Sequence, residues 1–151
     1  MIIEVQNEAM TRQLGERLAR FLRGGEVIEL IGDVGAGKTT FTKGLAHGLG
    51  ITEDVQSPSF TISRVYEVPS GLRLSHYDFY RLHDAGIMSH EVAEAMHDPQ
   101  TITIIEWAEA VDHVLTPERL QIKIIAPSVE ERQLELIPHG ARYEAVVEAM
   151  K

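Results

Sequence analysis

Strand-like runs alternate with helically spaced apolar positions in the first third of the chain. Two runs rich in aliphatic residues, Ile2–Val5 and Val27–Ile31, predict short strands. Between them Asn7 offers a helix N-cap, and apolar residues then recur at helical spacing as far as the two glycines at 24–25. A glycine-rich turn follows the second strand and leads into another amphipathic helix, whose apolar positions are Phe41, Leu45 and Leu49.

The rest of the chain predicts mostly strands. Residues 61–68 and 72–79 are strand-like, and Pro69-Ser70-Gly71 between them supplies the turn chemistry of a hairpin. Residues 84–98 predict a helix, and 101–105 predict a strand that runs into a glutamate. Two more strands and a closing helix follow, at 120–125, 133–137 and 143–150. We therefore expect a three-layer α/β fold with flanking helices and an antiparallel hairpin, as a single domain over residues 1–151.

The turn after the second strand carries the most informative motif. Its residues, Gly32-Asp33-Val34-Gly35-Ala36-Gly37-Lys38-Thr39, match the pattern G-x-x-x-x-G-K-[ST] of phosphate-binding loops. The motif lies where that pattern requires it, after a strand and at the start of a helix. We expect a P-loop NTPase-like sheet in which these eight residues and Thr40 bind a nucleotide.

Each residue type in the loop has a physical role. Gly32, Gly35 and Gly37 are expected to adopt positive φ and to bring backbone N–H groups close to a polyphosphate. Lys38 is expected to bridge β- and γ-phosphate oxygens, and the Thr39 hydroxyl to bind Mg²⁺. The following helix adds the positive end of its dipole. The sequence thus predicts a nucleoside triphosphate and Mg²⁺ as ligands.

A P-loop protein also needs an acid at the end of a neighbouring strand. Two candidates end strand-like runs, Glu106 after Thr101–Ile105 and Asp78 after Leu74–Tyr77. We expect Glu106 to bind the metal and Asp78 to position or deprotonate water. The Ser-His-Asp combination within residues 75–78 does not predict a catalytic triad, because neighbours on one strand point to opposite faces.

Two further features lie near these motifs. The segment Ser57-Pro58-Ser59-Phe60-Thr61 combines hydroxyl groups with a rigid proline, which suits either a switch-like loop around the γ-phosphate or a plain turn before a strand. Trp107, the sole tryptophan, directly follows Glu106, and a tryptophan is more often a packing residue than a ligand contact.

Composition narrows the class of protein. The 151 residues include 23 acidic and 14 basic side chains, for a formal charge of −9, which argues against a free-standing nucleic-acid binder. No apolar run approaches the ~20 residues of a membrane span, and no secretory signal is evident. The chain has no cysteine, which excludes disulfides and thiolate metal sites. We expect a cytoplasmic protein without a membrane partner.

The type of nucleotide follows from a missing motif. Guanine recognition by N-K-x-D needs an asparagine, but the sole asparagine is Asn7, which glutamate follows, so ATP is favoured over GTP. A small-molecule kinase would need an arginine-bearing lid, and no segment has that pattern. Arg81 is the nearest candidate for an arginine finger, although surface solvation is the commoner role of such a residue.

Together these residues resemble the TsaE (YjeE) family of small P-loop ATPases in tRNA threonylcarbamoyladenosine biosynthesis. The resemblance rests on Gly32–Thr40, Ser57–Thr61, His76-Tyr77-Asp78-Phe79-Tyr80-Arg81-Leu82 and Glu106-Trp107, in that order, and it covers roughly residues 7–110. The segment 83–91 departs from the family pattern.

The resemblance implies roles that agree with those expected from the residues. Lys38, Thr39 and the glycine loop match the family's phosphate and Mg²⁺ site. Glu106 matches its metal acid, and Asp78 its aspartate implicated in hydrolysis. It also implies TsaD and TsaB as partners, with tRNA reached only through their complex. The leading hypothesis is a partner-stimulated, Mg-dependent ATPase; a small-molecule kinase and a non-catalytic nucleotide-switched binding module are the alternatives.

Overall fold

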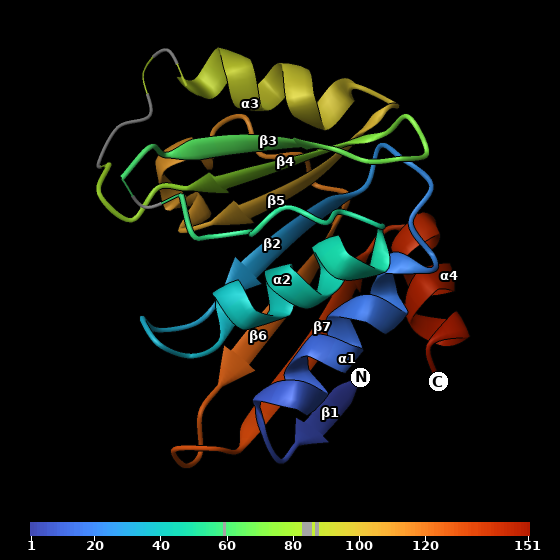
Figure 1. Ribbon diagram of the computed structural model, residues 1–151. Coiled ribbons are helices and arrows are strands. Elements are labelled where there is room, and N and C mark those ends of the chain that lie inside the picture. The colour runs from blue at the N-terminus through green and yellow to red at the C-terminus, as the bar shows by residue number, and fades with distance from the viewer. Residues whose placement is uncertain (59, 83–85, 87) are drawn as a thin grey trace.

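Seven strands form one mixed sheet in the computed structural model, which describes residues 1–58, 60–82, 86 and 88–151 (Figure 1). The strands are β1 Ile2–Val5, β2 Val27–Ile31, β3 Ser63–Glu67, β4 Arg73–Asp78, β5 Thr101–Glu106, β6 Arg119–Ile125 and β7 Arg132–His139. The helices are α1 Glu8–Ala19, α2 Lys38–Gly48, α3 Met88–His97 and α4 Ala141–Ala149, with a short 3-10 helix, η1, at Ala108–Val111.

The order across the sheet is β1-β7-β6-β2-β5-β4-β3. Its centre is parallel, because β2 pairs in parallel with β5 and β6, and β4 pairs in parallel with β5. The edges are antiparallel: β7 lies between β6 and β1, and β3 forms the predicted hairpin with β4. The carboxyl ends of β2, β4 and β5 therefore meet at one edge of the sheet, where α/β folds place their ligands.

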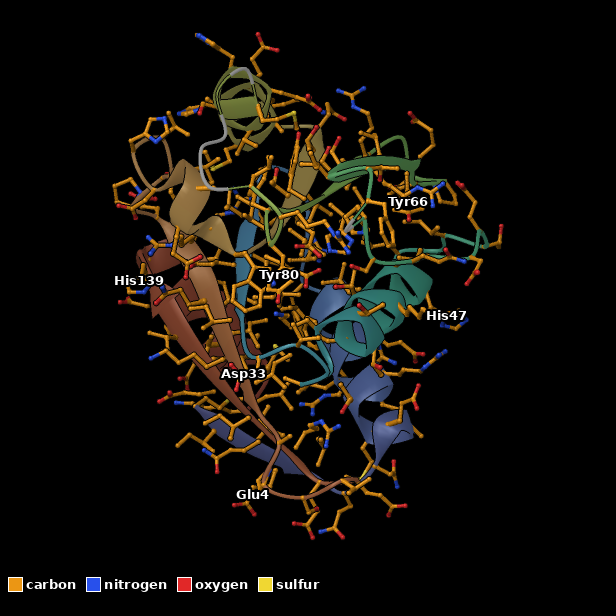
Figure 2. All side chains as sticks on the ribbon, turned by 90° about the vertical axis from the view of Figure 1, so that its left-hand side faces the viewer. Glu4, Asp33, His47, Tyr66, Tyr80 and His139 are labelled. Atoms are coloured by element: carbon orange, nitrogen blue, oxygen red, sulfur yellow. The ribbon has the colours of Figure 1, made fainter. Side chains whose placement is uncertain are left out.

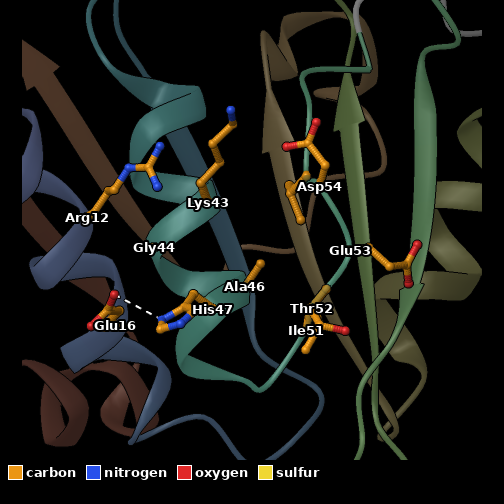
Figure 3. Close-up of a pocket in the computed structure, with 11 residues that line it drawn as sticks. Arg12, Glu16, Lys43, Gly44, Ala46, His47, Ile51, Thr52, Glu53 and Asp54 are labelled. Carbon is orange, nitrogen blue, oxygen red and sulfur yellow. Dashed lines mark hydrogen bonds and ion pairs between the residues drawn. The ribbon is translucent and has the colours of Figure 1, made fainter.

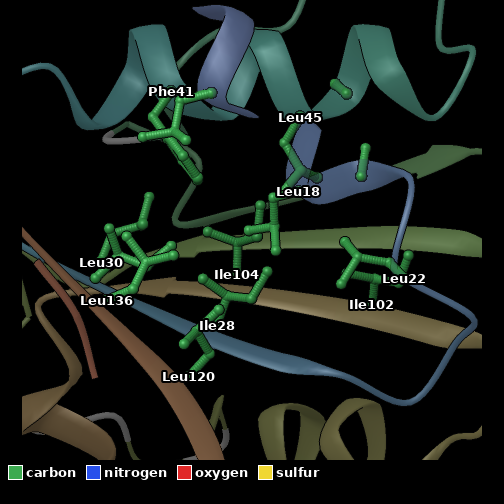
Figure 4. Packing of buried hydrophobic residues seen from close by; sticks show 14 of the residues in the cluster. Leu18, Leu22, Ile28, Leu30, Phe41, Leu45, Ile102, Ile104, Leu120 and Leu136 are labelled. Carbon is green, nitrogen blue, oxygen red and sulfur yellow. The ribbon is translucent and has the colours of Figure 1, made fainter. Parts of the chain in front are cut away.

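Helices cover both faces of the sheet, which confirms the expected layered α/β fold (Figure 1). On one face, Leu18 of α1 and Phe41 and Leu45 of α2 pack over alternate residues of the strands, such as Ile28 and Ile104 (Figure 4). On the other face, α3 and η1 pack against a smaller cluster that contains Tyr77 and Ile105. Among the described residues, no helix is both long and apolar enough to cross a membrane.

The predicted element boundaries hold to within a few residues. Asn7 caps α1 as expected, since its side-chain oxygen accepts a hydrogen bond from the Met10 N–H at 2.9 Å. The strand expected over 61–68 begins only at Ser63, because Ile62 has a left-handed φ of 71° and its N–H donates to the Pro58 carbonyl. The helix expected over 84–98 begins at Met88, and residues 83–85 and 87 lie outside the described part of the chain.

Glycines allow α1 and α2 to pack backbone against backbone. A Cβ atom on Gly15 would lie 2.5 Å from the Phe41 carbonyl oxygen, and one on Gly44 would overlap the Arg12 carbonyl group. Contacts this short leave no room for a methyl group on either helix. This packing fixes α2, and with it the loop that precedes α2, against α1.

Replacing Gly44 by alanine should lower the free energy of unfolding by about 1–3 kcal/mol, because the methyl group forces the helices apart. The sign of this change is informative, because replacing glycine by alanine in an unobstructed helix stabilises the helix by about 1 kcal/mol. Urea unfolding followed by circular dichroism measures the change. Glu94→Ala, at an exposed position of α3, is the control and should stay within about 0.5 kcal/mol. A Gly44→Ala protein as stable as that control would contradict the close contact.

Candidate active site

The glycine loop joins the end of β2 to the start of α2, as the sequence predicts. Gly35 and Gly37 have φ of 83° and 111°, conformations that favour glycine. The expectation of positive φ is wrong for Gly32. This residue needs to be glycine for another reason, because a Cβ atom there would lie 2.7 Å from the carbonyl oxygen of Ile124 on β6. The loop is thus bent by two glycines and pressed against the sheet at the third.

The other loop residues differ in exposure. Asp33 and Val34 are exposed at the tip of the loop, whereas Ala36 is buried. Thr39 and Thr40 are half-buried in the first turn of α2. Asp33 and Tyr80 lie on the same side of the molecule, the side that faces the viewer in Figure 2.

Lys38 is buried at the start of α2, with only 6% of its surface exposed. Its Nζ donates a hydrogen bond of 2.5 Å to the Gly32 carbonyl oxygen and lies 4.0 Å from Oε1 of Glu106. The same atom lies 4.1 Å from the centre of the Trp107 ring, a cation–π contact. Burial lowers the pKa of Lys38 below its ordinary value, and the carboxylates around it, Glu106 first, oppose that shift.

The two candidate acids lie side by side. The parallel register of β4 and β5 pairs Asp78 with Glu106, and both are buried, at 4% and 2% exposure. Oε2 of Glu106 lies 2.6 Å from Nε2 of His76, which is fully buried two residues before Asp78 on the same face of β4. Ser75 points to the opposite face, so the exclusion of a catalytic triad within 75–78 agrees with the structure.

Asp78 is held by different partners. Its Oδ1 accepts a hydrogen bond from the Tyr80 N–H at 3.0 Å, and its Oδ2 accepts one from the Ser57 hydroxyl at 3.1 Å. In addition, the Asp78 N–H donates to the Ile62 carbonyl at 2.9 Å. The segment before β3 is therefore bonded to the acid expected to act on water.

The remaining residues of the predicted switch-like loop lie around this contact. Pro58 is buried, and Thr61 is exposed. Phe60 is 85% exposed, with the Arg81 guanidinium 4.5 Å from the centre of its ring. Arg81 thus stacks on an aromatic ring of this loop. Ser59 lies outside the described residues.

Trp107, directly after Glu106, has an unusual backbone conformation. Its φ of 57° and ψ of 53° are left-handed, which a bulky residue rarely adopts. Its ring contacts Lys38 and also the ring of Tyr80, whose centre is 4.9 Å away. Strained residues of this kind cluster at functional sites. Sequence reasoning missed Tyr80, although its place in the strand-end segment after Asp78 was a usable signal.

A second group that the sequence did not reveal borders the loop on its other side. Nε of Arg132, at the start of β7, donates a 2.8 Å hydrogen bond to the Ala36 carbonyl. A cavity of about 380 Å³ opens beside it, lined by the first residues of α1, the P-loop and the β6–β7 connection. Thr11 also lines this cavity, and its buried hydroxyl has no hydrogen-bond partner among the described residues. Only tertiary structure brings residues so distant in sequence together.

A larger cavity, of about 470 Å³, lies elsewhere, between the two helices and the chain after α2 (Figure 3). Arg12, Lys43 and His47 line one side, and Glu53 and Asp54 the other. No residue of the glycine loop contributes to it. The largest set of predicted site residues, at the ends of β2, β4 and β5, therefore lies away from this larger cavity.

Known proteins are similar to this chain in both sequence and fold. The family model described as threonylcarbamoyl adenosine biosynthesis protein TsaE matches residues 5–134. The tRNA threonylcarbamoyladenosine biosynthesis protein TsaE of Bacillus subtilis (strain 168) is 41% identical over 146 residues, 95% of this chain and 89% of that protein. The protein of the same name from Streptomyces coelicolor is 40% identical over 114 residues, 75% of this chain and 77% of its own.

The structural comparison agrees with the sequence matches. The crystal structure of Bacillus subtilis YdiB superposes with a TM-score of 0.81 and 37% identity, over 99% of this chain and 93% of that one. The family model and these relatives show that the chain belongs to the TsaE family, the proteins of tRNA threonylcarbamoyladenosine biosynthesis.

Proposed function

We propose that this protein is a Mg-dependent ATPase whose weak intrinsic hydrolysis is stimulated by the partners TsaD and TsaB. The observation that carries the proposal is the pair Asp78 and Glu106, buried side by side at the strand ends, with Lys38 and the glycine loop facing Glu106. A loop that only bound phosphate would need no second buried acid, because burying a carboxylate is costly.

The donors present suit Mg²⁺. A hydroxyl on Thr39 and a carboxylate on Glu106 are hard oxygen ligands, and they would hold the ion together with phosphate oxygens. Within the described part of the chain, no cluster of three or more His, Cys, Asp or Glu offers an all-protein cage, which matches the way Mg²⁺ is bound at phosphate sites. When bound, Mg²⁺ neutralises charge on the β- and γ-phosphates.

The chain's own groups supply the remaining chemistry. Lys38 exchanges its hydrogen bond to the Gly32 carbonyl for phosphate oxygens, and the N–H groups at the start of α2 point at the same charge. Asp78 orients the attacking water and accepts its proton. Since Ser57 donates to Asp78, the switch-like loop is placed to couple the γ-phosphate to that acid.

The cavity beside Arg132 is the place we propose for the base. It adjoins Gly37 and Thr40, and the polar side chains of Asn7 and Arg132 line it. A mixed polar lining of this kind can read a nucleobase edge. The absence of an N-K-x-D sequence favours ATP over GTP as the nucleotide.

The partners are proposed to complete the site. Val34 at the tip of the glycine loop, Phe60 in the switch-like loop and Tyr80 after β4 are exposed apolar side chains, at 71%, 85% and 54% exposure. Exposed apolar groups gathered at a site indicate protein contacts. With a charge of −9, the chain is expected to reach tRNA through the TsaD–TsaB complex.

The affinity for ATP should fall at alkaline pH, as Lys38 loses its proton. The protonated amine binds phosphate, and because burial lowers its pKa, affinity should begin to fall at a lower pH than for an exposed lysine. Calorimetric titration with a non-hydrolysable ATP analogue between about pH 7 and pH 10 measures this. Lys38→Arg is the control, since arginine stays charged throughout that range. Equal pH profiles for the two proteins would show that Lys38 does not carry the phosphate contact.

Glu106→Gln and Asp78→Asn should each lower TsaD–TsaB-stimulated phosphate release about 100-fold or more. Both changes keep side-chain shape and remove charge. Glu94→Gln, on the far face of the sheet, should retain full activity. Full stimulated hydrolysis in either site variant would refute the catalytic assignment.

The same assay separates the alternatives. A phosphorylated metabolite without free phosphate would indicate a kinase. Hydrolysis at background despite ATP-dependent partner binding would indicate a switch module.

A further inference from the structure

A fully buried histidine lies directly beneath the proposed metal acid. His76 has no exposed surface, and its Nε2 lies 2.6 Å from Oε2 of Glu106. Its other ring nitrogen, Nδ1, is buried and makes no hydrogen bond to any described residue. Among the described residues, Glu106 is therefore the one hydrogen-bond partner of this side chain.

The surroundings of His76 make that bond significant. On β4 its side chain follows Leu74 on the same face, and its partner across the β4–β5 pairing is Ile104; both are fully buried apolar residues. Across the β3–β4 pairing its partner is Arg64, which is exposed. An imidazole here leaves a buried nitrogen unpaired, at a cost of roughly 1–3 kcal/mol, which an aliphatic side chain would avoid. Packing thus gives no reason for a histidine at this position, whereas Glu106 does.

The direction of the hydrogen bond follows from the partners. A carboxylate only accepts, so Nε2 carries the proton and donates it to Oε2. This leaves Oε1 on the side of Lys38, 4.0 Å from Nζ. The two oxygens of Glu106 thus have separate partners, one inside the sheet and one at the phosphate loop.

We propose that His76 is a positioning residue that fixes the Glu106 carboxylate so that Oε1 is presented to Mg²⁺. The inference rests on the proposed function and adds to it a residue behind the metal ligand. Outer-sphere hydrogen bonds to ligating carboxylates set the orientation of the ligand, and their loss typically costs 10–100-fold in metal affinity.

The role is specific to one acid. Asp78 takes its hydrogen bonds from Ser57 and from the Tyr80 N–H, on the other side of the strand end. Loss of the His76 donor should therefore weaken the metal site and leave the orientation of Asp78 unchanged. Stimulated hydrolysis by such a variant should need more Mg²⁺ but approach the normal rate when Mg²⁺ saturates.

Three variants test the proposal. His76→Leu removes the donor, and His76→Gln keeps an amide N–H near the position of Nε2. Thr103→Val is the matched control, because the Thr103 hydroxyl on β5 is equally buried and has no hydrogen-bond partner in the described part of the chain, but faces away from Glu106. Circular dichroism confirms that each variant is folded. Mn²⁺ affinity is measured by electron paramagnetic resonance with a non-hydrolysable ATP analogue, so the readout does not depend on hydrolysis.

The expected result is a 10–100-fold weaker Mn²⁺ affinity for His76→Leu, recovery to within about 3-fold for His76→Gln, and no change for Thr103→Val. Unchanged metal affinity in folded His76→Leu would overturn the inference alone. So would a His76→Gln protein as weak as His76→Leu, since shape and not the donor would then matter. Failure of the unmodified protein to bind Mn²⁺ with the analogue would overturn the proposed function as well.

Discussion

The parallel pairing of β4 with β5 sets the distance between the two acids on which the site depends. In this register Asp78 lies opposite Glu106, and a shift of one residue would turn either side chain to the other face of the sheet. Leu74, Ile102 and Ile104 lie in the larger core, and Tyr77 and Ile105 lie in the smaller one, so burial on both faces of the sheet holds the register. The placement of the two acids is thus a consequence of packing.

A second constraint holds the phosphate loop against that pair. The glycine contacts between α1 and α2 fix the start of α2, where Lys38 is buried. Gly32 presses the loop onto β6, and Arg132 bonds to the Ala36 carbonyl from β7. Elements from both halves of the chain therefore keep Lys38 within reach of Glu106.

Four side chains at the site contact one another in series. His76 bonds one oxygen of Glu106, the other oxygen faces Lys38, and the lysine lies over the ring of Trp107. Burial makes each of these interactions stronger than it would be in water and makes an unpaired group costly.

The sequence by itself determined the elements and the loop. Apolar periodicity located the seven strands and four helices to within a few residues, and the glycine pattern located the phosphate loop, because both signals are local. It also indicated both acids, since each ends a strand-like run. Only the tertiary structure decided that they are neighbours, that His76 bonds to Glu106, that the Tyr80 ring contacts Trp107, and that Arg132 reaches the loop. These contacts depend on strand order and register, which link residues far apart in the chain and leave no mark on the local pattern.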